Sequence, residues 1–116
     1  MPILLPEDLR RPLPPMFRVR QQFNRQQLSD AAAETRSQLA RPEIRALVKP
    51  GARTAVAVGS RGIRNLLPIV RAVVSGLKEL GARPFILSAM GSHGGGTPEG
   101  QREVLASYGI TEKNLG

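Results

Sequence analysis

The sequence predicts an α/β protein, built on a parallel βαβα unit of an open sheet and preceded by a proline-rich N-terminal arm and a helix. Two short apolar runs, at 54–59 and 84–91, are bounded by glycine or proline and have the composition of strands buried on both faces. Between them, residues 65–80 place apolar side chains at helical spacing. After them, residues 97–109 open with Thr-Pro-Glu and close with glycine, as helices commonly do.

The N-terminal part of the chain predicts an extended segment. Residues 1–16 contain five of the ten prolines, which fix φ and remove backbone N–H donors. The run FRVRQQF (17–23) alternates apolar and polar residues and predicts a short strand. We therefore expect an arm over 1–16 and the N-terminal, incomplete part of an α/β domain over 17–116, since a length of 116 residues allows one domain at most.

A first helix is expected within residues 28–48. Ser29 or Asp30 provides a cap for its N-terminus, and Pro42 should end or bend it. The apolar residues at helical spacing are Leu28, Ala32 and Leu39.

The helix expected over 65–80 has Asn65 as its cap, Pro68 in its first turn and Gly81 as its stop signal. Its apolar face consists of Leu66, Ile69, Val70, Val73, Val74, Leu77 and Leu80. The helix expected over 97–109 has Thr97 as its cap. Because the two strands are parallel, both strand-to-helix turns fall at the same edge of the sheet, where ligands bind in open α/β folds.

The composition excludes several classes of protein. The chain has no cysteine, which rules out disulfides, thiolate metal sites and cysteine nucleophiles. It has no apolar run near the roughly 20 residues of a transmembrane helix and no signal peptide, so we expect a cytoplasmic protein. The net charge of +8 suggests nucleic-acid binding, but the 17 cationic residues are scattered and only 3% of residues are aromatic. Nucleic acid is therefore a disfavoured partner.

The turn GSRGIRN (59–65) has features of an anion site. Its glycines allow close backbone approach, and a helix N-terminus follows it. Arg61 and Arg64 add guanidinium groups suited to carboxylate or phosphate. The alternative is a tight turn whose arginines point into solvent. The turn matches neither the P-loop pattern nor GxGxxG.

The second turn contains the only histidine. His93 follows the second strand and precedes a helix, and residues 91–96 contain four of the twelve glycines. An imidazole titrates near neutral pH and suits general acid/base chemistry, and the glycines let a planar ligand approach the backbone. The alternative is a mobile loop without chemistry. No second base or metal-ligand cluster accompanies His93, so spacing alone does not select a reaction.

Three segments, VAVGSRGIRNLLPIV, GARPFILSAMGSHGGGTPEGQREVL and YGITEKN, resemble the N-terminal domain of the nickel-pincer lactate racemase family. The resemblance covers about residues 48–116. It implies two α/β domains around a nickel-pincer nucleotide tethered to a lysine, with two histidines flanking the substrate carbon. One histidine takes the hydroxyl proton of a 2-hydroxy acid while the cofactor takes the α-hydride, and the resulting ketoacid is reduced again on either face.

Within this resemblance, the motif Gly-x-His places the first acid/base histidine at His93. The family's Asp-x-Thr-Arg turn places its substrate-holding arginine at Arg64. Arg61 stands where the family has aspartate, and Ile63 replaces threonine. Two arginines suit a larger or more anionic hydroxy acid than lactate, and rapid racemisation of D-lactate would contradict that hypothesis.

The resemblance also implies that the cofactor contacts Ser60 and the glycines after the histidine, which are Gly94, Gly95 and Gly96. The cofactor-bearing lysine, the nickel-ligating histidine and the second acid/base histidine are not among the matched residues, and this chain provides no metal ligand. We therefore expect a fragment that is inactive alone and whose partners are a small anionic hydroxy acid and the remainder of the enzyme. The alternative is a non-catalytic phosphate- or nucleotide-binding α/β module that uses the same two turns.

Overall fold

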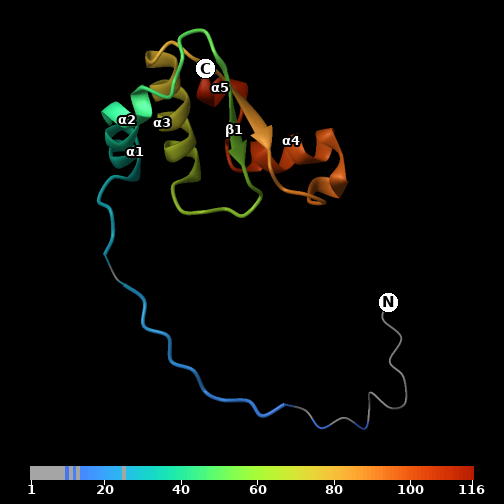
Figure 1. Cartoon of the computed structure of the whole chain (residues 1–116). Helices are drawn as coiled ribbons and strands as arrows, with labels where there is room; N and C mark the ends of the chain where they lie inside the picture. Colours follow the sequence, from blue (N-terminus) through green and yellow to red (C-terminus); the bar gives the residue numbers. More distant parts are fainter. Residues whose placement is uncertain (1–9, 11, 13, 25) are drawn as a thin grey trace.

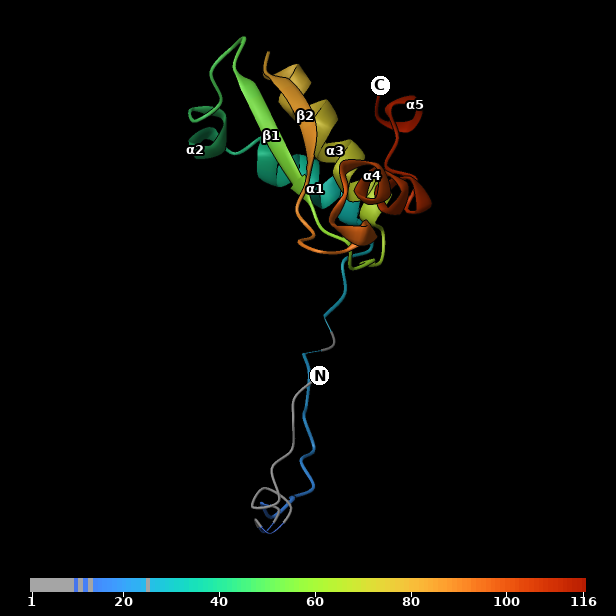
Figure 2. The same ribbon diagram turned by 90° about the vertical axis from the view of Figure 1, so that its right-hand side faces the viewer.

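The computed structural model describes residues 10, 12, 14–24 and 26–116. It confirms the α/β class, with a two-stranded parallel sheet and helices packed against it (Figure 1). Strand β1 spans Arg53–Val58 and strand β2 spans Arg83–Ser88, and the two pair in parallel over their whole length. Figure 2 shows the strands side by side.

Helix α3, Leu66–Glu79, connects the two strands as predicted. The predicted apolar face is buried most deeply at Val70, Val74 and Leu77. Asn65 occupies the N-cap position of α3 as predicted, but its backbone is left-handed (φ 65°) and its side chain makes no capping hydrogen bond. The first turn is instead closed by backbone hydrogen bonds, including one from the Leu66 N–H to the Ile63 carbonyl at 3.2 Å.

The first helix is confirmed and is interrupted at Pro42. Helix α1, Ala31–Leu39, begins at Asp30, whose carboxylate accepts a hydrogen bond from the Ala33 N–H at 2.9 Å. Arg41 has extended backbone before Pro42, and a separate short helix α2, Pro42–Arg45, follows. Helix α1 packs against α3 so closely that a Cβ on Gly76 would lie 2.8 Å from Cδ1 of Leu39.

The C-terminal part contains the predicted helix and one further turn of helix. Helix α4, Pro98–Ser107, starts at Thr97, whose hydroxyl accepts from the Gly100 N–H at 3.1 Å, which confirms the predicted cap. It is preceded by a 3-10 turn, η2, over Gly94–Gly96 and followed by α5, Glu112–Leu115. The core consists of Val58, Val70, Val74, Met90, Leu105 and Ile110.

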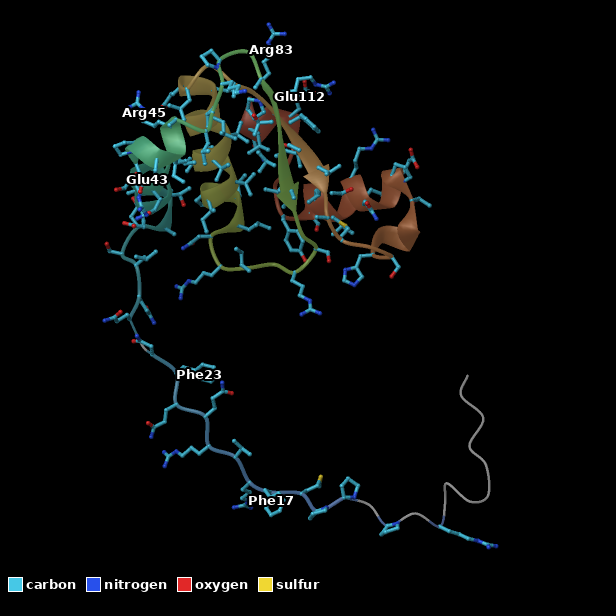
Figure 3. The ribbon with its side chains drawn as sticks, in the orientation of Figure 1. Phe17, Phe23, Glu43, Arg45, Arg83 and Glu112 are labelled. Carbon is cyan, nitrogen blue, oxygen red and sulfur yellow. The ribbon has the colours of Figure 1, made fainter. Side chains whose placement is uncertain are left out.

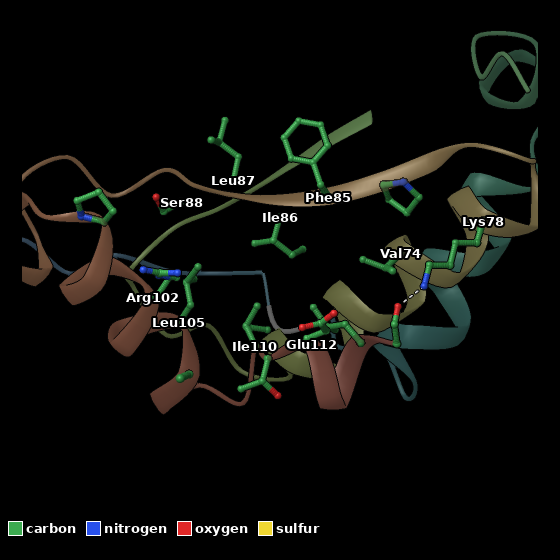
Figure 4. A pocket seen from close by; sticks show the side chains of 16 residues that line it. Val74, Lys78, Phe85, Ile86, Leu87, Ser88, Arg102, Leu105, Ile110 and Glu112 are labelled. Atoms are coloured by element: carbon green, nitrogen blue, oxygen red, sulfur yellow. Dashed lines mark hydrogen bonds between the residues drawn. The ribbon is translucent and has the colours of Figure 1, made fainter. Parts of the chain in front are cut away.

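The strands are covered on one face only, so the prediction of strands buried on both faces is wrong. Along each strand, residues facing the helices alternate with exposed ones. Leu87 is 50% exposed, and Figure 4 shows Phe85 and Leu87 on the side of β2 opposite Ile86. The physical reason is that α3, α4 and α5 contribute to one core on the inner face, and no described element covers the other face.

The strand predicted over 17–23 is absent, and residues 14–24 form neither helix nor strand. The reason is that no described strand lies beside this segment to pair with it. Phe17 is 80% exposed, and Figure 3 shows Phe17 and Phe23 on an extended segment away from the helices. The arm predicted over 1–16 falls largely outside the described residues. Within the described part of the chain, none of the helices combines the length and apolar composition needed to cross a membrane.

Candidate functional site

The two turns predicted to share a sheet edge meet in space. The turn after β1 contains Ser60, and the turn after β2 contains His93. The Ser60 hydroxyl and Nδ1 of His93 are hydrogen-bonded to each other. Parallel pairing of the strands brings these residues together, since Val58 lies opposite Ser88 at the carboxyl ends of both strands. The only imidazole of the chain is therefore held at the edge where the sequence predicted a site.

The Ser60 contact determines which imidazole nitrogen is available for chemistry. A hydroxyl both donates and accepts, so Ser60 can satisfy Nδ1 whether or not that nitrogen carries the proton. When Nδ1–H donates to Ser60, Nε2 has a free lone pair and is a base. Once Nε2 has taken up a proton, the ring is an imidazolium, whose Nδ1–H still donates to Ser60 and whose Nε2–H is the acid. Either state keeps the hydrogen bond between Ser60 and His93.

The glycine turn around His93 is fixed by its neighbours. The Gln101 side-chain amide donates to the Gly91 carbonyl at 2.7 Å, and its oxygen accepts from the Ser88 hydroxyl at 2.6 Å. Gly94 has a φ of 64°, and a Cβ there would overlap the backbone of Gly100. The close approach of Gly94 and Gly100 and the Gln101 bridge are the contacts that hold the turn in this conformation.

Tyr108 contacts the turn that follows β1. Its hydroxyl donates to the Ser60 carbonyl at 2.7 Å, and its ring fills the space beside Gly62, where a Cβ would lie 2.9 Å from Cε1. Tyr108 and Gln101 are positioning residues that the sequence analysis missed. Tyr108 is 48 residues from its partner along the chain. The sequence feature that could have pointed to Tyr108 is that it is the only tyrosine in a chain poor in aromatic residues.

Three of the predicted site residues line one cavity of about 640 Å³. Ser60, Arg61 and His93 provide its polar groups. Arg64 does not line the cavity, although it lies in the same turn as Arg61. Among the described residues, we find no hydrogen-bond or ion-pair partner for either guanidinium, and both side chains are exposed. The geometry therefore favours Arg61 as the anion-binding group.

The predicted cofactor-contacting glycines lie outside this cavity and differ from one another. Gly94 is packed against Gly100, whereas no described atom lies within 4 Å of a Cβ built on Gly95 or Gly96. All three have positive φ, which favours glycine. Only Gly95 and Gly96 leave open space beside the backbone.

A larger cavity of about 880 Å³ lies under β2, between that strand and the helices α3, α4 and α5 (Figure 4). Its walls are mainly apolar, and none of the predicted site residues lines it. Its two basic residues already have partners, because Lys78 donates to the Gly116 carbonyl and Arg102 pairs with Glu99 at 3.1 Å. This cavity is lined by Ser88, Thr111 and Glu112, but it has no imidazole and no basic side chain without a described partner.

No metal site is formed within the described part of the chain, where no three histidine, cysteine, aspartate or glutamate side chains gather closely enough to bind an ion. The fold and site thus define a small α/β unit with a serine, a histidine and an arginine at the carboxyl edge of a parallel sheet. No family model, no curated protein and no solved structure matches the chain.

Proposed function

We propose that this chain supplies the acid/base and anion-binding half of a site that racemises or epimerises a small anionic 2-hydroxy acid, in a cytoplasmic enzyme of the nickel-pincer lactate racemase type. The observation that carries the proposal is the hydrogen bond between Ser60 and His93. The imidazole and the Arg61 side chain line the same cavity.

Each polar group has a role that its chemistry supports. The Arg61 guanidinium binds the substrate carboxylate through paired N–H donors. Nε2 of His93 accepts the hydroxyl proton and later returns it, while Ser60 stays bonded to Nδ1 in both states. Gln101 and Tyr108 position the two turns through the contacts described above.

The described residues do not fit a nickel site of their own, because the whole sequence has one histidine and no cysteine and the described carboxylates do not cluster. The proposal assigns the metal, the pincer nucleotide and the residues that hold them to another domain or polypeptide. Open space beside Gly95 and Gly96 is compatible with a planar group near the backbone.

The proposal predicts that 2-hydroxy acids bind to the chain at Arg61. Titration with lactate, followed by the NMR signals of the single imidazole, should show saturable shifts. Arg61→Gln should weaken binding about tenfold or more, since a hydrogen bond to a charged group contributes about 1.5–3 kcal/mol. Arg83→Gln is the matched control, because Arg83 is an exposed arginine at the opposite end of the sheet.

Other outcomes of this titration would contradict the proposal. Tight binding of inorganic phosphate without any effect of hydroxy acids on His93 would favour the phosphate-binding module. Steeply salt-dependent binding of DNA or RNA would favour a nucleic-acid partner, which the proposal excludes. The proposal also expects the chain alone to leave either enantiomer of lactate unchanged.

A further inference from the structure

The cavity behind Ser60, Arg61 and His93 is apolar along most of its length. Residues of β1 and of the first half of α3 line it. Its apolar wall includes Val56, Val58, Ile63, Leu66, Ile69 and Val73. From Leu66 to Val73 a helix rises about 10 Å, so the wall continues well beyond the polar mouth.

The polar groups are confined to one end. Ser60 and Arg61 come from the turn after β1, and His93 comes from the turn after β2. The rest of the lining comes from β1, α3 and short apolar stretches of these turns. A ligand complementary to this arrangement is an anion at one end and a bulky hydrocarbon at the other.

We infer that the substrate is a 2-hydroxy acid with a large apolar side chain, of about four carbon atoms or more, which lies along α3 while its carboxylate binds Arg61. This inference rests on the proposed function. Binding sites for small molecules typically combine about 300–1,000 Å³ of mostly apolar space with a few polar groups, and lactate would leave most of this cavity unfilled.

The same geometry argues against a substrate with a second anionic group. The pair of arginines in the turn suggested two kinds of substrate, a more anionic hydroxy acid or a larger one. Arg64 does not line the cavity, so Arg61 is the one guanidinium among the described lining residues. The other option, a larger acid, agrees with the apolar wall.

The experiment compares the dissociation constants of lactate and 2-hydroxy-4-methylpentanoate for the full chain, measured on the His93 signals. The second acid has three more carbon atoms. A buried methylene contributes about a fourfold change in affinity, so we expect 2-hydroxy-4-methylpentanoate to bind at least about tenfold more tightly.

A variant in the turn at the polar end of the cavity tests where the apolar side chain of the substrate binds. Ile63 is 57% exposed and lies in a turn, so Ile63→Ser should fold normally. It should reduce the preference for the larger acid by about fourfold, the effect of losing roughly one methylene contact. Leu47→Ser is the control, because Leu47 is 77% exposed and does not line this cavity, and it should leave the preference unchanged.

The outcomes separate this inference from the proposed function. If both acids bind with equal affinity and Arg61→Gln weakens both, the inference is wrong and the proposed function stands. If the preference for the larger acid exists but Ile63→Ser and Leu47→Ser reduce it equally, the side chain binds elsewhere and the inference is wrong. If neither acid shifts the His93 signals, both are contradicted.

Discussion

Truncation of Leu105 to alanine is expected to lower the free energy of unfolding by about 2–5 kcal/mol. Leu105 is 6% exposed and joins α4 to the core formed by β1, α3 and Ile110. Removing its side chain leaves a cavity in a core with few other buried residues. Because small domains are stable by only about 5–15 kcal/mol, the variant should lose a large part of its stability in urea unfolding.

The control for this variant is Leu87→Ala. Leu87 is 50% exposed on the open face of the sheet, so the same change of side chain should cost far less. Equal losses for the two variants would mean that α4 does not pack against the strands as described, and that the two turns are not held together by the core.

The second large effect is expected for Gly94→Ala. Gly94 has a φ of 64°, and a Cβ there would lie 2.6 Å from the carbonyl oxygen of Gly100 and overlap that residue's carbonyl carbon. Both atoms belong to the backbone at the start of α4, so neither can rotate away. The turn must shift, and we expect the contact between His93 and Ser60 to be lost together with binding of hydroxy acids.

Gly95→Ala provides a matched control. Gly95 has a φ of 68°, almost the same as that of Gly94, but no described atom lies within 4 Å of its would-be Cβ. The variant therefore carries only the left-handed backbone cost, about 1–2 kcal/mol. Comparable losses of binding in the two variants would show that backbone conformation alone, and not the approach of Gly94 to Gly100, is responsible.

Much of the fold follows from local signals in the sequence. The spacing of apolar residues predicted both strands and α3, and Asp30 and Thr97 cap helices as their positions indicated. The errors concern properties that local pattern does not contain. An apolar run predicts a strand buried on both faces whether or not a second layer of helices covers the sheet. The alternating run 17–23 predicts a strand, but no described strand lies beside it to pair with.

The site was predictable in its place but not in its contacts. Parallel strands imply that both turns share an edge, and His93 and Ser60 do meet there. Nothing in residue spacing distinguishes Arg61 from Arg64, since which guanidinium faces the cavity depends on the path of the turn. Gln101 lies in α4 and Tyr108 directly follows that helix, and both contact turns that come earlier in the chain, so their roles appear only in three dimensions.

The most direct test of the proposed half-site is the NOE between the imidazole ring protons of His93 and the β protons of Ser60, measured in the wild type and in the control Ser92→Ala. His93 is the only histidine, so its ring signals are unambiguous. The hydrogen bond between the Ser60 hydroxyl and Nδ1 brings the two side chains together whichever ring nitrogen carries the proton. We therefore expect the NOE in both proteins. Its absence from both would show that Ser60 does not hold His93, and it would contradict the proposed half-site.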